Sequence, residues 1–108
     1  MNFDKYQELA ALTAEYPQHR ALTYLCLKLN GEAGEVAEKF GKIIRDRGGF
    51  IREEDRETLA KELGDVQWYI SEIARTLGYR LSKIAEMNIA KLADRAARGV
   101  IGGSGDDR

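Results

Sequence analysis

Two short motifs of acidic residues are the part of this sequence best suited to chemistry. Glu32 and Glu35 form the first motif, Glu62 and Asp65 form the second, and each motif has a glycine inside it. In a helix, residues three apart lie on one side. Two such pairs on neighbouring helices would bring four carboxylates together, and their mutual repulsion would need compensation. Hard divalent cations, which prefer oxygen ligands, are the usual reason for such a cluster.

The ligand types narrow the choice of metal. Carboxylate oxygens favour Mg²⁺ or Mn²⁺ over zinc. A di-iron centre in a helical bundle would want a Glu-x-x-His pair on each of two helices, and His19, the only histidine, is in no such motif. The competing interpretation is a solvated helix face whose acids pair with lysines such as Lys39 and Lys42. Gly34 and Gly64 argue against this solvated-face interpretation, because each glycine costs roughly 1 kcal/mol of stability inside a helix.

A second candidate site lies late in the chain. Asn88, Lys91, Arg95 and Arg98 fall within about 80° of one another when they are placed on a helical wheel. Amide and cationic donors in one strip suit phosphate oxygens. The alternative is a basic helix end, where cations interact favourably with the helix dipole.

Helices must position these residues, because the composition favours helix and no segment alternates as a strand would. The apolar periodicity predicts four helices, over roughly residues 2–16, 19–45, 53–77 and 81–98. Pro17 and Gly78 mark two of the ends. The predicted fold is therefore all-α, a bundle-like four-helix domain over residues 1–98. Residues 99–108 form a tail with too many glycines to be helical.

Composition and charge limit the classes of function. The net charge of −1 gives no global field that favours nucleic acid or a membrane surface. No signal peptide or membrane-spanning run is recognisable, so the expected location is the cytoplasm. The wide apolar stripes of the second and third helices suggest burial against another subunit. Cys26 lies on an apolar helix face and is expected to be a buried, reduced thiol, whereas Glu38 is expected to be solvated.

These motifs resemble the all-α nucleoside triphosphate pyrophosphohydrolases, in the MazG-like branch. Glu32, Glu35, Glu62 and Asp65 meet the family pattern of Glu-x-x-Glu, a spacer and Glu-x-x-Asp. The similarity continues to the final Gly-Ser-Gly-Asp-Asp-Arg and covers nearly the whole chain. It implies a homodimer, or dimers paired into a homotetramer, that uses Mg²⁺ to hydrolyse a nucleoside triphosphate to the monophosphate and pyrophosphate. Many members clear non-standard nucleotides, and others act on ordinary deoxynucleotides.

The resemblance gives most candidate residues an expected role. The four acids would hold the metal, and Glu35, furthest from the apolar stripe, would be the base that activates water. Asn88, Lys91 and Arg95 would bind phosphate, and the tail over residues 99–108 would close over the nucleotide as a flap.

Three residues are candidates for binding the base. Trp68 and Tyr69 could stack on it, although both could instead pack at a subunit interface. Gln7 could read a base edge, since its amide both donates and accepts hydrogen bonds.

Two other functions remain open from the sequence. One is a non-catalytic helical interaction module, in which the acids are only surface charge. The other is a regulator that binds nucleotides without turning them over. Nucleic-acid binding ranks last, because the basic strip is too short to follow a phosphate backbone.

Overall fold

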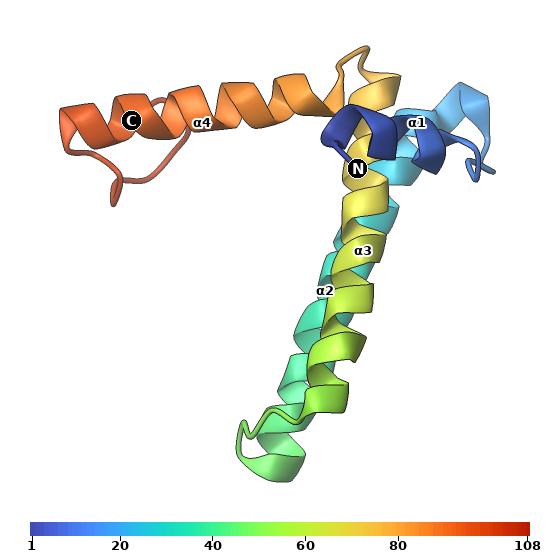
Figure 1. The fold of residues 1–108 in the computed structure, drawn as a ribbon, viewed down its shortest axis with the longest axis vertical. Helices are drawn as coiled ribbons and strands as arrows, with labels where there is room; N and C mark the ends of the chain where they lie inside the picture. Colours follow the sequence, from blue (N-terminus) through green and yellow to red (C-terminus); the bar gives the residue numbers. More distant parts are fainter.

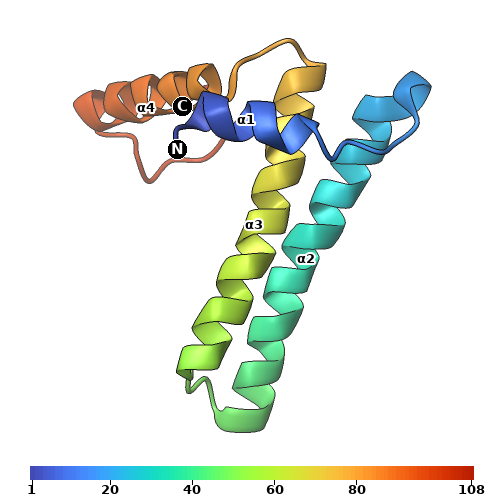
Figure 2. The same cartoon turned by 45° about the vertical axis from the view of Figure 1, so that its right-hand side comes forward.

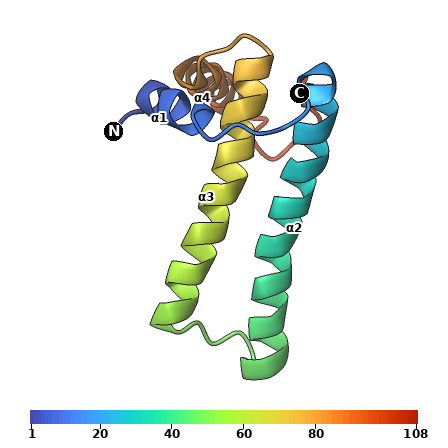
Figure 3. The same ribbon diagram turned by 90° about the vertical axis from the view of Figure 1, so that its right-hand side faces the viewer.

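Two long antiparallel helices form the body of the molecule. In the computed structural model, which describes residues 1–108, α2 (Ala21–Arg47) and α3 (Glu53–Thr76) lie alongside each other as a hairpin (Figure 3). α1 (Phe3–Ala11) crosses the hairpin near the end of α3, and α4 (Leu81–Arg98) projects away from it (Figures 1 and 2). Four α-helices and no strands confirm the all-α prediction. No helix is long and apolar enough to span a membrane.

The first helix is shorter than its periodicity predicts. A short 3₁₀ helix, η1 (Gln18–Arg20), follows it and leads into α2. The Ala10 carbonyl accepts hydrogen bonds from Trp68 Nε1 at 3.2 Å and from Thr13 Oγ1 at 3.0 Å. These donors compete for an acceptor of the last helical turn, so α1 ends at Ala11, well before Pro17.

The turn between α2 and α3 is built from local hydrogen bonds. Gly48 adopts the left-handed conformation with φ of 62°, which ends α2 without the steric cost that a side chain would bring. The Arg52 backbone N–H donates to Asp55 Oδ2 at 2.8 Å and caps α3, and Arg47 forms an ion pair with the same carboxylate. The hairpin therefore holds its two acid-bearing helices in a fixed register.

Few side chains are buried. Only 10 of the 108 residues are, and eight of them belong to α1, the start of α2, the end of α3 and the start of α4. The other two are Ile43, close to the α2–α3 turn, and Arg95, on the outer part of α4. A groove of about 500 Å³ runs between α3 and α4, lined by apolar side chains that include Leu63, Ile70 and Ile84. Cys26 is exposed, which corrects the prediction of a buried thiol, because no other helix of the chain covers that side of α2.

A buried carboxylate fastens the segment after α1 onto α3. Glu72 is fully buried and accepts hydrogen bonds from Tyr16 Oη at 2.7 Å and from Arg75 at 2.8 and 3.1 Å. Tyr16 also stacks on Tyr24 of α2, with 5.9 Å between the ring centroids. Burial raises the pKa of Glu72, but the hydrogen bonds from Arg75 and Tyr16 outweigh it and leave that pKa below its ordinary value.

Replacing Glu72 with Gln is expected to lower the free energy of unfolding by about 1–3 kcal/mol at pH 7, because it removes the charge that Arg75 pairs with. The folded-state pKa is lowered, so this contribution is present above the unfolded value of about 4.3 and is lost as the pH falls through the folded value. Urea unfolding should therefore show a gap between the wild type and E72Q that shrinks below about pH 4.

The exposed acid Glu57, also on α3, supplies the control, and E57Q should stay within about 0.5 kcal/mol of the wild type. A gap between E72Q and the wild type that is independent of pH would show that the Glu72 charge has no part in this anchor.

Candidate metal centre

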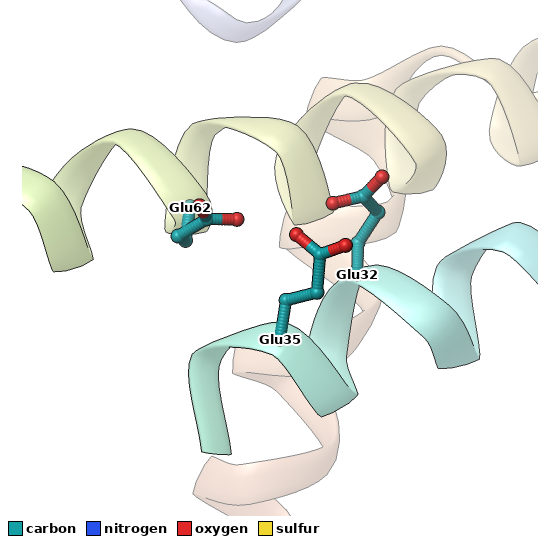
Figure 4. A group of neighbouring side chains, drawn as sticks. All are labelled: Glu32, Glu35 and Glu62. Atoms are coloured by element: carbon teal, nitrogen blue, oxygen red, sulfur yellow. The ribbon is translucent and has the colours of Figure 1, made fainter. Parts of the chain in front are cut away.

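Three of the predicted acids converge across the hairpin. Glu32 and Glu35 extend from α2 and Glu62 extends from α3, and their carboxylates face one another (Figure 4). One oxygen from each lies within 4.8 Å of the others. Two oxygens on opposite sides of a Mg²⁺ ion lie about 4.2 Å apart, so small side-chain rotations would bring the three within ligand distance.

The hairpin explains this convergence. Residues three apart share a helix face, so Glu32 and Glu35 both project toward α3. A Cβ added at Gly34 or at Gly64 would meet no heavy atom within 4 Å, so both glycines leave open space beside the acids. Close packing against another helix of the same chain is therefore not what these glycines provide.

The cluster carries more negative than positive charge. The charge of Glu32 is the main cause of a raised pKa at Glu35, and Glu62 adds to it through a hydrogen bond and its own charge. The positive charge of Lys39 lowers the pKa of Glu35, and Lys39 Nζ lies 3.4 Å from Glu62 Oε1. Glu62 Oε2 is buried and has no hydrogen-bond partner. A set of hard oxygen ligands with one unsatisfied atom, and with repulsion that Lys39 offsets only in part, fits a divalent cation.

Asp65 lies beside this group rather than within it. It lines an adjoining hollow of about 360 Å³ together with Glu32, Thr13, Trp68 and Tyr69. Asp65 is exposed, so its carboxylate is free to turn toward the other three acids. The structure thus brings all four predicted acids to one region, with three of them in direct proximity.

The two aromatic candidates form one wall of the same hollow. Trp68 and Tyr69 meet edge to face, with 4.9 Å between ring centroids and 80° between their planes. Trp68 Nε1 donates to Thr13 Oγ1 at 2.9 Å and to the Ala10 carbonyl, which fixes the indole against the end of α1. The indole N–H is therefore occupied, and stacking is the interaction that this ring can still offer a ligand.

Gln7 has a different role from the predicted one. Its side chain is buried, and its Nε2 donates to the Tyr79 carbonyl at 2.9 Å and to the Ser71 carbonyl at 3.4 Å. Its Oε1 accepts from the Leu81 backbone N–H at 3.0 Å. Because its N–H groups and its carbonyl oxygen are already hydrogen-bonded to the backbone, Gln7 is not available to recognise a base. Its role in the structure is to link α1 to the turn between α3 and α4.

The basic strip on α4 lies apart from the acids within this chain. Lys91 Nζ and Arg95 Nη2 both contact Asp106 Oδ1, at 2.7 and 3.0 Å. Asn88 and Lys91 border a hollow of about 320 Å³ beside the same aspartate. Since α4 makes no contact with α2 and projects from the hairpin, one protomer does not bring the strip to the acid cluster (Figure 2).

Two partners of the site residues are not evident from the sequence. Helical spacing suggests Lys39 as a partner for acids on its own helix, but it pairs across the hairpin with Glu62, which only the packing of α2 on α3 determines. Asp106 lies in an irregular tail, where no periodicity indicates which residues it meets. Glu38 is exposed and pairs with Lys42 at 3.2 Å, as expected of a solvated acid.

Comparison with known proteins gives a family match and a similar phage protein. A family model described as the MazG nucleotide pyrophosphohydrolase domain matches residues 20–99, which include all four acids and the α4 strip. The chain is also 46% identical over 114 residues to the "Gene 37 protein" of Mycobacterium phage L5, a match that covers 100% of both chains. No solved structure matches it.

Proposed function

Because the chain belongs to the MazG nucleotide pyrophosphohydrolase family, we propose that it hydrolyses a nucleoside triphosphate to the monophosphate and pyrophosphate in the presence of Mg²⁺. The observation that carries this proposal is the convergence of Glu32, Glu35 and Glu62 within 4.8 Å. Three carboxylates beside a single lysine favour a divalent cation as their ligand. Their oxygen-only chemistry suits Mg²⁺, or Mn²⁺ in its place.

The acids have distinct roles in this proposal. Glu32, Glu62 and Asp65, together with Glu35, would hold the metal, which when bound supplies positive charge to the triphosphate oxygens. Glu35 is exposed and is the best placed of the three clustered acids to reach a water molecule. It would accept a proton from that water as the water oxygen bonds to phosphorus. The bond to the bridging oxygen then breaks, and pyrophosphate leaves with its electron pair.

Glu35 can be tested as the base separately from its part in the cluster. The variant E35Q keeps an oxygen ligand but cannot take a proton, so we expect kcat to fall about 100-fold or more. Binding of Mn²⁺, followed by its electron paramagnetic resonance signal, should weaken much less. An E35Q enzyme with wild-type kcat would assign the base role to another group.

The nucleobase would occupy the hollow beside Glu32 and Asp65. That hollow is lined by the aromatic rings of Trp68 and Tyr69 and by the two acids. A base stacked on these rings would have its phosphates directed toward the acids, as hydrolysis of the triphosphate requires.

A second subunit would complete the site. Glu62 lies about 21 Å along α3 from the end of that helix, Arg95 lies about 21 Å along α4 from its start, and the two helices diverge (Figure 1). A triphosphate bound to the acids therefore cannot also reach Lys91 and Arg95 of the same chain. We propose a homodimer, alone or paired into a homotetramer, in which α4 of the partner brings these cations to the acids. The apolar groove between α3 and α4 is the surface available for that contact.

We assign the catalytic role to residues 1–98, and we propose that residues 99–108 form a flap that lies on Lys91 and Arg95 before substrate binds. Pyrophosphate release tests the whole proposal, measured over a panel of ordinary, deoxy and modified nucleoside triphosphates with Mg²⁺ and with a chelator. Release that requires Mg²⁺ is the expected result. Nucleotide binding without release would favour a regulator, and neither binding nor release would favour a helical interaction module.

A further inference from the structure

The glycine-rich tail is an ordered loop that returns to α4. After α4 the chain turns back along the outer part of that helix (Figures 1 and 2). The Arg108 guanidinium donates to three carbonyls of the loop itself, those of Val100, Ile101 and Gly105, at 3.1, 3.2 and 2.6 Å. A Cβ at Gly103 would lie 2.7 Å from Arg108 Cδ, so a side chain there would displace the Arg108 side chain from its present position. The loop therefore has its own internal support, and it presents Asp106 to the helix.

Asp106 is held by the two cations assigned to phosphate. Its Oδ1 lies 2.7 Å from Lys91 Nζ and 3.0 Å from Arg95 Nη2, and its backbone carbonyl accepts a further hydrogen bond from Arg95 Nη2 at 2.7 Å. Hydrogen bonds from Lys91 and Arg95 lower the pKa of the Asp106 carboxyl. The carboxylate is thus a bound anion on the strip, supplied by the chain itself.

Arg95 has capacity that Asp106 does not use. Its side chain is only 6% exposed, and Nε is buried without a hydrogen-bond partner, because Asp106 engages Nη2 alone. A guanidinium presents Nε and Nη2 as a fork that matches two oxygens of one phosphate. A phosphate group would therefore satisfy Arg95 better than the carboxylate does, while using the same two cations.

We propose that Asp106 is a built-in competitor for phosphate, which covers the Lys91–Arg95 strip until a phosphate of the substrate displaces its carboxylate and releases the tail. This inference rests on the proposed function, since it takes the strip to be the phosphate site. It makes the tail self-inhibitory: removing the Asp106 charge should favour substrate binding.

The competition can be measured without catalysis. Inorganic tripolyphosphate is titrated calorimetrically into the full-length protein, in chelator, so that no metal at the acid cluster contributes. D106N removes the charge and keeps the backbone contact to Arg95, so its Kd should be about three- to tenfold lower than that of the wild type. D107N is the matched control. It makes the same charge change one residue away, at a side chain that has no hydrogen bond or ion pair, and its Kd should equal that of the wild type.

A second measurement follows the tail directly. In ¹⁵N-labelled wild type, amide signals of residues 102–108 should move toward unstructured positions as tripolyphosphate saturates. The inference is overturned if D106N binds no more tightly than the wild type, if D107N gains as much, or if phosphate binds while the tail signals stay in place. Binding by neither protein also overturns it, and pyrophosphate release, assayed separately with Mg²⁺, then decides whether the proposed function still stands.

Discussion

Replacing Glu62 with Gln should lower kcat/KM for pyrophosphate release by about a thousandfold or more, because a bound metal ion is worth several kcal/mol of charge stabilisation. Glu62 is the only clustered acid contributed by α3, and its side chain is 14% exposed. Without its charge, Glu32 and Glu35 would face only a neutral amide oxygen and the more distant Asp65 on α3, so the cluster would hold a cation much less tightly. Pyrophosphate release should be measured as a function of Mg²⁺ concentration, and Mn²⁺ affinity in a separate binding experiment. E62Q should release less pyrophosphate and bind Mn²⁺ more weakly than the wild type.

The variant E38Q is the control for that loss. Glu38 is 65% exposed on α2 and pairs only with Lys42, so removing its charge should leave kcat/KM within about twofold of the wild type. Circular dichroism would verify that both variants are helical. Wild-type activity and metal dependence in E62Q would exclude these carboxylates from metal binding and favour the interaction-module interpretation.

Two impaired variants, E62Q and K91M, should recover activity when they are mixed. K91M alone should lose about 10- to 100-fold in kcat/KM, because a charged contact to phosphate is lost. If Lys91 acts on the acids of the partner subunit, a dimer of one E62Q chain and one K91M chain has one intact site. Random exchange makes half of the dimers mixed and leaves one of two sites intact in each, so about a quarter of wild-type activity should return.

A mixture of E62Q with E35Q controls for the exchange. Both changes lie in the acid cluster of a single chain, so no arrangement of subunits creates an intact site, and activity should stay absent. If neither mixture recovers activity although mass spectrometry shows mixed dimers, Lys91 serves the acids of its own chain, and the proposed division of the site between subunits is wrong.

The helices can be predicted from the sequence where local pattern decides them. Periodicity predicts the fourth helix over residues 81–98, and it is observed as Leu81–Arg98, since Gly99 ends it in the left-handed conformation. The expected span of the third helix, residues 53–77, differs from Glu53–Thr76 by one residue. The end of α1 depends instead on Trp68, 58 residues beyond Ala10, whose N–H takes part in engaging the Ala10 carbonyl. Periodicity within a segment carries no information about such a contact.

In the candidate site, too, local spacing predicts some features, and contacts between distant residues decide the others. Spacing alone places Glu32 and Glu35 on one face, so their approach to Glu62 requires only that the two helices pack side by side. The prediction for Gln7 is wrong because its side-chain amide is already hydrogen-bonded to backbone groups of the turn after α3. Helical spacing gives no information about those bonds. The contact between Asp106 and Arg95 also depends on the path of an irregular loop. Its glycines allow many backbone conformations, so the sequence does not predict which one is adopted.

The small number of buried residues has a consequence for how the protein behaves on dilution. With 10 of 108 residues buried and Leu63, Ile70 and Met87 among the exposed apolar side chains, little of the folding free energy comes from one chain alone. If the groove between α3 and α4 is covered by another copy, stability follows mass action, and the unfolding temperature should rise with protein concentration. Diluted chains would then lose tertiary structure and catalytic site together, so the amount of protein present would set the activity of each molecule as well as the total.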